Sequence, residues 1–565
     1  MDSAELTKRF NSSYASMRNE LNNMIPIYKD IRNFIAPRTA RFEGEQLNDG
    51  TRQDLDMINS NPRDAVRVMA YGLQSGVTSP MRPWFTLGLP DPELQEYDAV
   101  KDWLYLVEKR MRDVFARSNI YDKLQSTYRT LGTYGTACFG IDEDDDGVLR
   151  AYDYPIGTFM VASDATGRTN VMYRDVWYTA IQMYEKFKDT IKGGKDNLPQ
   201  GVLQAVENGN YSQQFYVVHI VEPNKNYKAG SALSKHKKYS SVYWLPGKNG
   251  DEAILSYKGY DFKPFMAPRW DLIGEDTYGY GCGELALGDS KQMQLMEKRK
   301  LQGIDKNTHP TMLADASMRN QRTSSLPGDT VYVSGLISGN PGYRKAYDTN
   351  PYIGELKEEI GNVNERIDRA FFKNLFMMVS EFADQPNITA TQINTMREEK
   401  LLMLGPVLER LNEELLDPLI SITFDIMMEA GMIPEPPEEI QGMNLKIEYI
   451  SILAQAQKAL KVGNIERFVG FIGNYAAQKQ DPSVWDKVND DETIDEYAEG
   501  VGIPATMLNS QEVTDSIRAQ RAQDMAQAKA MEQMQMSVDS AKKLSETNMS
   551  EDSALSQAIG MTGAG

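Results

Sequence analysis

The stretch that decides the fold runs from Asn387 to Ile452 and reads NITATQINTMREEKLLMLGPVLERLNEELLDPLISITFDIMMEAGMIPEPPEEIQGMNLKIEYISI. It predicts one very long helix, a Pro-rich stop and then a strand. A helix from Thr389 to Gly431 would be roughly 60 Å long, which suits an assembly better than a single small core. Pro406 and Pro418 each remove a backbone donor, so we expect kinks there. The apolar stripe repeats at three- and four-residue steps: Leu404, Leu408, Leu411, Leu415, Leu419, Ile422 and Ile426.

The N-terminal half predicts an α+β fold, with helices first and a mostly antiparallel sheet after them. Helical periodicity covers residues 4–35, where Pro26 is expected to interrupt the helix, and then 61–78 and 98–131, the last as one or two helices. Alternating or β-branched runs follow at 137–141, 148–152, 171–178, 216–222, 241–245 and 253–257.

Two further helices are expected over 283–306 and 352–378, separated by a segment rich in Gly, Pro and Ser. The second has an apolar stripe that suits either packing against neighbouring helices or an ordinary amphipathic helix of a monomer. A polar break follows at 379–390. Residues after 510 are rich in Ala, Gln and Met and predict a marginal helix, with a disordered end over 549–565.

Composition limits the function classes. The chain has 565 residues, 41% hydrophobic content and a net charge of −19. That charge argues against a protein that grips nucleic acid over its whole surface, because phosphate neutralisation requires Lys and Arg. It is compatible with DNA that slides past. Two cysteines, Cys138 and Cys282, indicate a reducing compartment and small packed side chains. No apolar run is long enough for a membrane span, and the N-terminus does not resemble a secretory signal.

The sequence contains no pattern that supports an enzyme. There is no G-x-x-x-x-G-K-(S/T), no G-x-S-x-G and no HExxH, and the three histidines lie far apart. Gly279, Gly281 and Gly283 have the wrong spacing for a dinucleotide fingerprint and are expected to allow a sharp turn into the next helix. No cofactor is expected.

An acidic segment is the one candidate for a metal. Asp142, Asp144, Asp146 and Asp153 fit part of a calcium-loop pattern. Position twelve is Asp rather than a bidentate Glu, and the flanks predict strands. An acidic hairpin turn is therefore the preferred interpretation, with a metal-dependent enzyme built on Asp142–Asp153 as the alternative function.

Several segments together resemble one family. SGVTSP at 75–80 with RPWF at 82–85, GTACFG at 135–140, YGYGCG at 278–283 and LAQAQ at 453–457 accompany the TAT and LGPVLERL motifs of the opening stretch. In this order they are similar to the head-to-tail connecting (portal) proteins of short-tailed bacteriophages. Cys282 stands where that family is expected to have proline. The resemblance spans roughly residues 5–475.

The resemblance implies a division of the chain into the parts of a portal. These parts are a wing (1–282), a first stem helix (283–306), a clip (307–351), a second stem helix (352–378), a channel loop (379–390), a long kinked helix (391–431), a wing return and crown (432–510), and a barrel-like C-terminal helix with its tail (511–565).

The same resemblance implies residue roles. The DNA channel is expected to involve Lys298, Arg299, Lys300, Ser380, Glu381, Asp384, Gln385 and Asn387. Lys298, Arg299 and Lys300 are consecutive, so they cannot all face one lumen, and a solvated or ion-paired role is the preferred interpretation. The clip is expected to dock the terminase or the tail through Arg319, Arg322, Tyr343, Arg344 and Lys345. The subunit interface is expected along Ile353, Leu356, Ile360, Val363, Ile367 and Phe371.

A portal implies a homo-oligomeric ring, expected to have twelve subunits, that sits at one capsid vertex. Its expected partners are double-stranded DNA in the channel, terminase, the major capsid and scaffolding proteins, and tail adaptor proteins, with no membrane. The expected location is the virion, and the host cytoplasm during assembly. A coiled-coil scaffolding protein is a second alternative, which the aromatic α+β half argues against.

Overall fold

The computed structural model describes residues 3–45, 50, 53–91, 94, 97–144, 147–191, 194–248, 250–310, 312–314, 343–345, 353–377, 404–442, 445–449, 452–479, 482–501, 508–509 and 511–546. The chain forms two compact units. Unit 1 comprises residues 1–86, 107–434 and 447–464, and unit 2 comprises residues 87–106, 435–446 and 465–565. Helices and an antiparallel sheet together confirm the expected α+β class.

The first helices appear where the apolar periodicity places them. They are α1 (Ser3–Phe34), α2 (Asn61–Val77), α4 (Asp98–Arg117) and α5 (Ile120–Tyr134). The prediction that Pro26 interrupts the first helix is wrong, because α1 continues through it. Leu21 on one side of Pro26, and Tyr28 and Ile31 on the other, are buried. Packing of this stripe on both sides outweighs the one backbone hydrogen bond that proline removes.

A five-stranded antiparallel sheet lies in unit 1, in the order β4-β5-β6-β7-β8. The strands are β4 (Phe159–Ser163), β5 (Thr169–Thr179), β6 (Gln214–Pro223), β7 (Tyr239–Trp244) and β8 (Ile254–Tyr260). A second sheet has the order β3-β2-β9, with β2 (Cys138–Asp144), β3 (Val148–Tyr154) and β9 (Phe265–Met266). The sequence patterns predicted β2, β3, β5, β6, β7 and β8 but not β4 or β9.

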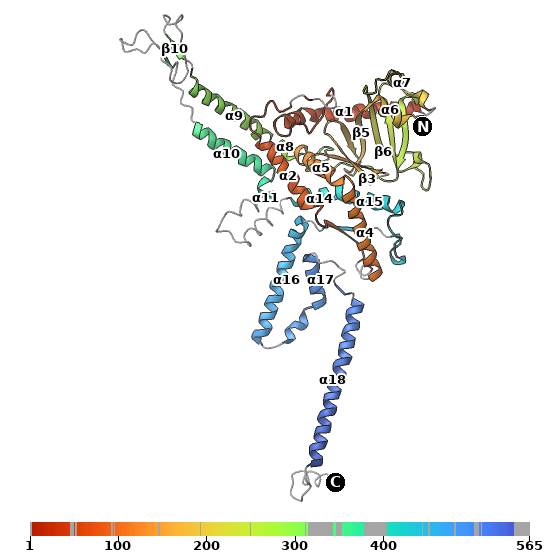
Figure 1. Cartoon of the computed structure of the whole chain (residues 1–565), viewed down its shortest axis with the longest axis vertical. Helices are drawn as coiled ribbons and strands as arrows, with labels where there is room; N and C mark the ends of the chain where they lie inside the picture. The colour runs from red at the N-terminus through yellow and green to blue at the C-terminus, as the bar shows by residue number, and fades with distance from the viewer. Residues whose placement is uncertain are drawn as a thin grey trace, which may run out of the picture. The chain divides into compact units, whose positions relative to one another are not determined.

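Both faces of the larger sheet are covered. Tyr243 packs toward the core of α6 (Ala180–Phe187) and α7 (Gln200–Glu207), beside Phe187. Trp244, the next residue of β7, packs instead against Phe10 and Tyr14 of α1. Successive strand residues point to opposite faces, so this one pair shows how α1 and the α6–α7 pair enclose the sheet (Figure 1).

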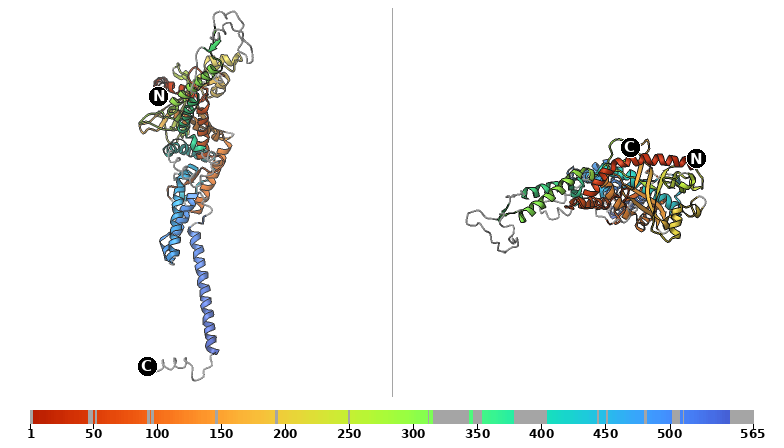
Figure 2. Two further views of the ribbon diagram at one scale, coloured as in Figure 1. Left: turned by 90° about the vertical axis from the view of Figure 1, so that its left-hand side faces the viewer. Right: turned by 90° about the horizontal axis from the view of Figure 1, so that it is seen from above.

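Two helices project side by side from the body of unit 1 (Figures 1 and 2). They are α9 (Leu287–Thr308), which follows the short α8 (Cys282–Leu285), and α10 (Ile353–Ala370). The prediction of one continuous helix over 352–378 is wrong at its end. Phe372 adopts a left-handed conformation with φ 55°, and a separate short helix, α11 (Lys373–Phe376), follows. The break allows Phe371 and Leu375 both to be buried.

The described part of the long helix contains one π-helical turn just before Pro418, and the kinks expected at Pro406 and Pro418 stay predictions. It consists of α14 (Gly405–Leu411), a π-helical turn over Asn412–Leu416, and α15 (Asp417–Glu429). Pro406 and Pro418 each lie in the first turn of an α-helical piece, where the missing N–H has no partner to lose. A π turn is one of the features at which helices bend, so the turn before Pro418 is compatible with the kink predicted there. Residues 391–403 lie outside the described ones.

The expected strand after the Pro-rich stop is β12 (Lys446–Tyr449), which pairs with β1 (Phe85–Gly88). The later helices are α16 (Ile452–Lys479), α17 (Asp490–Val501) and α18 (Gln511–Glu546). Within unit 2, Arg518 of α18 donates two hydrogen bonds to Asp491, at 2.7 and 2.6 Å. None of the described helices is long and apolar enough to cross a bilayer.

Candidate functional site

Three of the motifs that carry the family resemblance meet at one junction in unit 1. Gly135, which ends α5 with φ +84°, faces Gly279 so closely that a Cβ on Gly135 would lie 2.3 Å from the Gly279 carbonyl oxygen. A Cβ on Gly283 would lie 2.2 Å from the Thr133 carbonyl oxygen. The glycines lead into helices, α8 (Cys282–Leu285) and then α9 (Leu287–Thr308), and they also allow close backbone approach.

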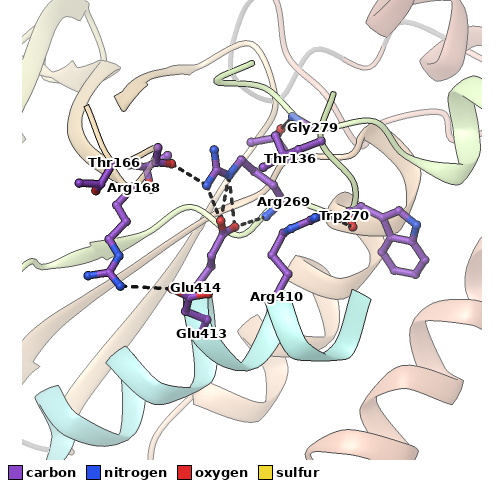
Figure 3. A network of polar contacts seen from close by, with 12 residues as sticks. Thr136, Thr166, Arg168, Arg269, Trp270, Gly279, Arg410, Glu413 and Glu414 are labelled. Atoms are coloured by element: carbon purple, nitrogen blue, oxygen red, sulfur yellow. Dashed lines mark hydrogen bonds and ion pairs between the residues drawn. The ribbon is translucent and has the colours of Figure 1, made fainter. Parts of the chain in front are cut away.

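Hydrogen bonds hold the two glycine-rich segments in register. The Gly279 N–H donates to Thr136 Oγ1 at 2.8 Å, and the Trp270 N–H donates to the Gly135 carbonyl at 2.8 Å. Gly279 and Thr136 are labelled in Figure 3. The GTA and YGYGCG segments are therefore one structural element, although about 140 residues separate them in the sequence.

The π turn of the long helix docks onto this element through a buried ion pair (Figure 3). Arg269 and Glu414 have side chains only 6% and 17% exposed. Glu414 accepts the Arg269 backbone N–H at 2.8 Å and the Arg269 Nε–H at 3.0 Å, and it also contacts Nη2. Arg410 adds a bond from Nη1 to the Trp270 carbonyl at 2.9 Å. Backbone and side-chain donors together hold the π turn and the end of α14 against the loop that contains Arg269 and Trp270.

A second set of contacts fixes the base of the α9–α10 pair against the start of α2. Gln294 of α9 is 4% exposed. Its Oε1 accepts the N–H groups of Ile58 and Asn59 at 2.7 and 2.8 Å, and its Nε2 donates to the Asn59 carbonyl at 2.8 Å. From α11, Lys373 donates to Asn61 Oδ1 at 3.1 Å. Asp368 of α10 accepts from Asn61 Nδ2 at 3.0 Å, so both projecting helices are tied to residues 58–61, where α2 begins.

The predicted channel residues are only partly described. Lys298 and Arg299 of α9 are exposed, and neither makes an ion pair with another described residue. Lys300 instead pairs with Glu297 of its own helix at 2.5 Å, which favours the ion-pairing role for this residue. Ser380, Glu381, Asp384, Gln385 and Asn387 lie outside the described residues.

The stripe predicted for the subunit interface is largely covered within one chain. Ile360, Val363, Ile367 and Phe371 are buried, because α10 packs between α9 and α2. Their burial needs no neighbouring subunit, so the structure assigns these four to the core of the chain. Ile353 and Leu356 are half-buried and remain interface candidates.

In the clip region the structure describes a two-stranded antiparallel ladder between α9 and α10. It pairs β10 (Met312–Ala314) with β11 (Tyr343–Lys345). The strand β11 is the backbone of the predicted docking residues Tyr343, Arg344 and Lys345. Arg319 and Arg322 lie outside the described residues.

The acidic segment is a hairpin, as preferred, and its described carboxylates do not converge on a metal. Asp144 pairs with Arg150 and accepts the Gly147 N–H. Asp142 accepts the Glu143 N–H, whereas Asp153, opposite Phe139 in the ladder, accepts from Ser126 at 2.6 Å. Asp146 lies outside the described residues, and those that are described contain no His, Cys, Asp and Glu cluster suited to a metal ion.

The remaining motif and the cysteines belong to the core of unit 1. Trp84 of the RPWF segment is buried and donates from Nε1 to the Tyr121 hydroxyl at 3.1 Å. Thr78 and Tyr128 share a buried hydrogen bond of 2.9 Å. Cys138 and Cys282 are free and buried, and burial raises the pKa of the Cys282 thiol to about 12, which suits packing rather than reactivity.

Arg269, Glu414 and Gln294 were not predicted from the sequence. Arg269 lies in an aperiodic loop, and Glu414 and Gln294 lie in helices rich in polar residues, so no spacing distinguishes them. Of the three, only Glu414 had a signal in the sequence, because it is the last fixed glutamate of the LGPVLERL-x-x-E-LL motif.

Comparison with known proteins agrees with this arrangement. A family model described as bacteriophage head to tail connecting protein matches residues 7–508. The portal protein of Salmonella phage epsilon15 is 40% identical over 558 residues, 99% of this chain and 98% of the relative. The probable portal protein of Bordetella phage BPP-1 is 36% identical over 554 residues, 98% of each. The chain therefore belongs to the family of bacteriophage head-to-tail connecting proteins.

Proposed function

We propose that this chain is a portal protein: copies of it form a ring at one capsid vertex, and the central channel passes DNA during packaging and ejection. The observation that carries the proposal is the similarity to two phage portal proteins over 98–99% of the chain. The paired α9 and α10, which project from the body of unit 1, support it, because such a pair can form a stem when copies assemble.

In this proposal the ring has twelve subunits, and double-stranded DNA passes through it. Lys298 and Arg299 are candidates to face the channel because both are exposed on α9. The channel loop of residues 379–390, with Ser380, Glu381, Asp384, Gln385 and Asn387, is assigned from the resemblance alone. The net charge of −19 per chain would keep phosphate contacts few, which favours sliding over tight binding.

The clip of residues 307–351 would dock the terminase motor during packaging and tail adaptor proteins afterwards. The β10–β11 ladder gives this part a regular element, from which Arg319, Arg322, Tyr343, Arg344 and Lys345 are proposed to reach the partner. The major capsid and scaffolding proteins would contact the ring during assembly in the host cytoplasm. The chain itself carries no ATP-binding motif, so the motor would be a separate protein, and the proposed role is not enzymatic.

The junction described above suits a part that carries load. Force on the stem would reach the wing through the hydrogen bonds that Gln294 of α9 makes with residues 58 and 59, just before α2. The long helix would be held by the Arg269–Glu414 ion pair. Because these contacts are buried and made by several hydrogen bonds, they resist displacement better than exposed contacts would.

Negative-stain electron microscopy of the purified full-length chain tests the proposal. Rings with a central hole are the expected result. Compact particles without a hole, both alone and with scaffolding protein added, would overturn it.

A further inference from the structure

An open cavity of about 690 Å³ lies on the wing within unit 1. Its walls are formed by residues of α1, the segment 41–45, the end of β3, and strands β5 and β6. Its volume falls in the range of sites that bind drug-sized ligands or several residues of a peptide. No role described above uses it.

Arg174 of β5 lines this cavity and has no carboxylate partner among the described residues. Its guanidinium carbon lies 4.1 Å from the centre of the Tyr154 ring, and burial and the Tyr154 hydroxyl dominate its surroundings. A largely buried guanidinium beside a tyrosine ring has no described carboxylate here to balance its charge. The cavity is therefore suited to an anionic group that reaches Arg174.

Two further polar atoms on the cavity wall are buried without a hydrogen bond. Asp153 accepts from Ser126 through Oδ2, but Oδ1 has no partner. Arg18 pairs with Asp175 at 3.0 Å through Nη2, but Nη1 has no partner. Buried polar atoms in native proteins are nearly always satisfied. This wall therefore lacks one donor, for Asp153, and one acceptor, for Arg18.

The rim is aromatic. Trp177 is 43% exposed and lies against Tyr216, with ring centres 5.2 Å apart, and Tyr152 is also exposed. Aromatic residues beside arginine are the composition that dominates binding energy at protein–protein interfaces. The rim can cover apolar parts of a ligand while the cavity wall binds its polar groups.

We propose that this cavity binds a short peptide segment of a partner protein, whose Asp or Glu side chain reaches Arg174 while its backbone N–H groups donate to Asp153. The acidic side chain supplies the carboxylate that Arg174 lacks, and a backbone N–H supplies the donor that Asp153 Oδ1 lacks. Inorganic phosphate would fill little of the cavity and would be repelled by Asp153. Single-stranded nucleic acid would bring several phosphates against Glu43, Glu45, Asp153 and Asp175, which also line the site.

The test is a selection in which a library of random short peptides is screened for binding to the assembled full-length protein. Peptides that also bind Arg174→Gln protein are removed by counter-selection. Enriched peptides are expected to share an acidic residue. Replacing that residue by its amide should weaken binding to the wild-type protein by about tenfold or more, the size of a charge-assisted hydrogen bond. The same replacement should change nothing in Arg174→Gln protein.

Two variants guard against misfolding and general charge effects. Arg150→Gln removes an exposed arginine of β3, a strand whose other end lines the cavity, although Arg150 itself does not. This variant should bind peptides as the wild-type protein does. Trp177→Ala alters only the exposed rim. It should weaken the acidic and the amide peptide alike and leave their ratio unchanged.

Four results would overturn the proposal. They are the absence of any enriched peptide, equal binding to Arg174→Gln protein, full displacement by millimolar inorganic phosphate, and stronger competition by peptides of this chain's own sequence. The last two would assign the cavity to a free anion or to a neighbouring copy of the chain.

Discussion

Arg269 and Glu414, 145 residues apart in the sequence, form a buried ion pair in which the carboxylate also accepts the arginine's own backbone N–H (Figure 3). The pair joins the loop before the glycine-rich segment to the π turn between α14 and α15. It holds the π turn against the loop at Arg269, and it lies among the motifs that carry the family resemblance.

Glu414→Gln should destabilise the protein strongly, because Arg269 is then left as a buried charge without a partner. Breaking such a pair costs about 3–5 kcal/mol. The adjacent Glu413→Gln provides the control, since Glu413 and its partner Arg168 are 63% and 78% exposed and such pairs contribute about 0–1 kcal/mol. Thermal melting of both variants checks this; equal melting temperatures would contradict the role assigned to Glu414.

Gly135→Ala should be far more damaging than Gly167→Ala. Both glycines have positive φ, +84° and +81°, so both substitutions carry a strain of about 1 kcal/mol. A Cβ on Gly167 meets nothing within 4 Å, whereas one on Gly135 would clash with the Gly279 carbonyl. We expect a further loss of about 2 kcal/mol or more for Gly135. Comparing the melting temperatures of the two variants separates the cost of the steric clash from the cost of positive φ. Similar losses in both variants would contradict the clash assigned to Gly135.

Gln294→Ala should loosen the base of α9. It removes three hydrogen bonds to residues 58 and 59 and leaves backbone groups without partners, at a cost of about 2–4 kcal/mol. Gln292→Ala is the matched control on the exposed face of the same helix. Hydrogen exchange of the Ile58 and Asn59 amides, directly before α2, should accelerate in Gln294→Ala only. Unchanged protection would show that the amide does not tie the stem to α2.

Glu108 of α4 should make stability depend on pH. Burial raises the pKa of its carboxyl to about 7, although Arg112 opposes the shift. A raised folded-state pKa means that the contribution is full below the unfolded pKa of about 4.3 and is lost as pH rises toward 7. Melting temperature should therefore fall across this window by more in wild type than in Glu108→Gln. Exposed Asp113→Asn on the same helix should keep the wild-type slope; a flat wild-type profile would contradict the raised pKa.

Much of the fold could be predicted because apolar periodicity decides it locally. The helices α1, α2 and α9 follow from three- to four-residue repeats, and the strands of the two sheets other than β4 and β9 follow from alternating or β-branched runs. The π turn lies just before Pro418, where the missing donor predicted an irregularity. Pro26 misled the prediction because tertiary packing of Tyr28 and Ile31 outweighs a local rule. The break at Phe372 could not be predicted, because a left-handed phenylalanine is set by what Phe371 and Leu375 pack against.

The site could be predicted only as motifs. The sequence singled out Gly279, Gly281 and Gly283, but their partner at Thr133–Gly135 follows only from the three-dimensional contact. The apolar stripe of α10 was predicted to face a neighbouring subunit because periodicity shows that a face is buried but not by what. Arg174 gave no signal, since a single arginine in a strand is ordinary until its lack of a carboxylate partner is seen.

The most direct test of the central claim is the native mass of the purified full-length chain. A portal ring of twelve copies of a 63.7 kDa chain should give a mass of roughly 764 kDa. A stable mass of one or two chains, in protein that melts cooperatively and in the presence of scaffolding protein, would contradict the account.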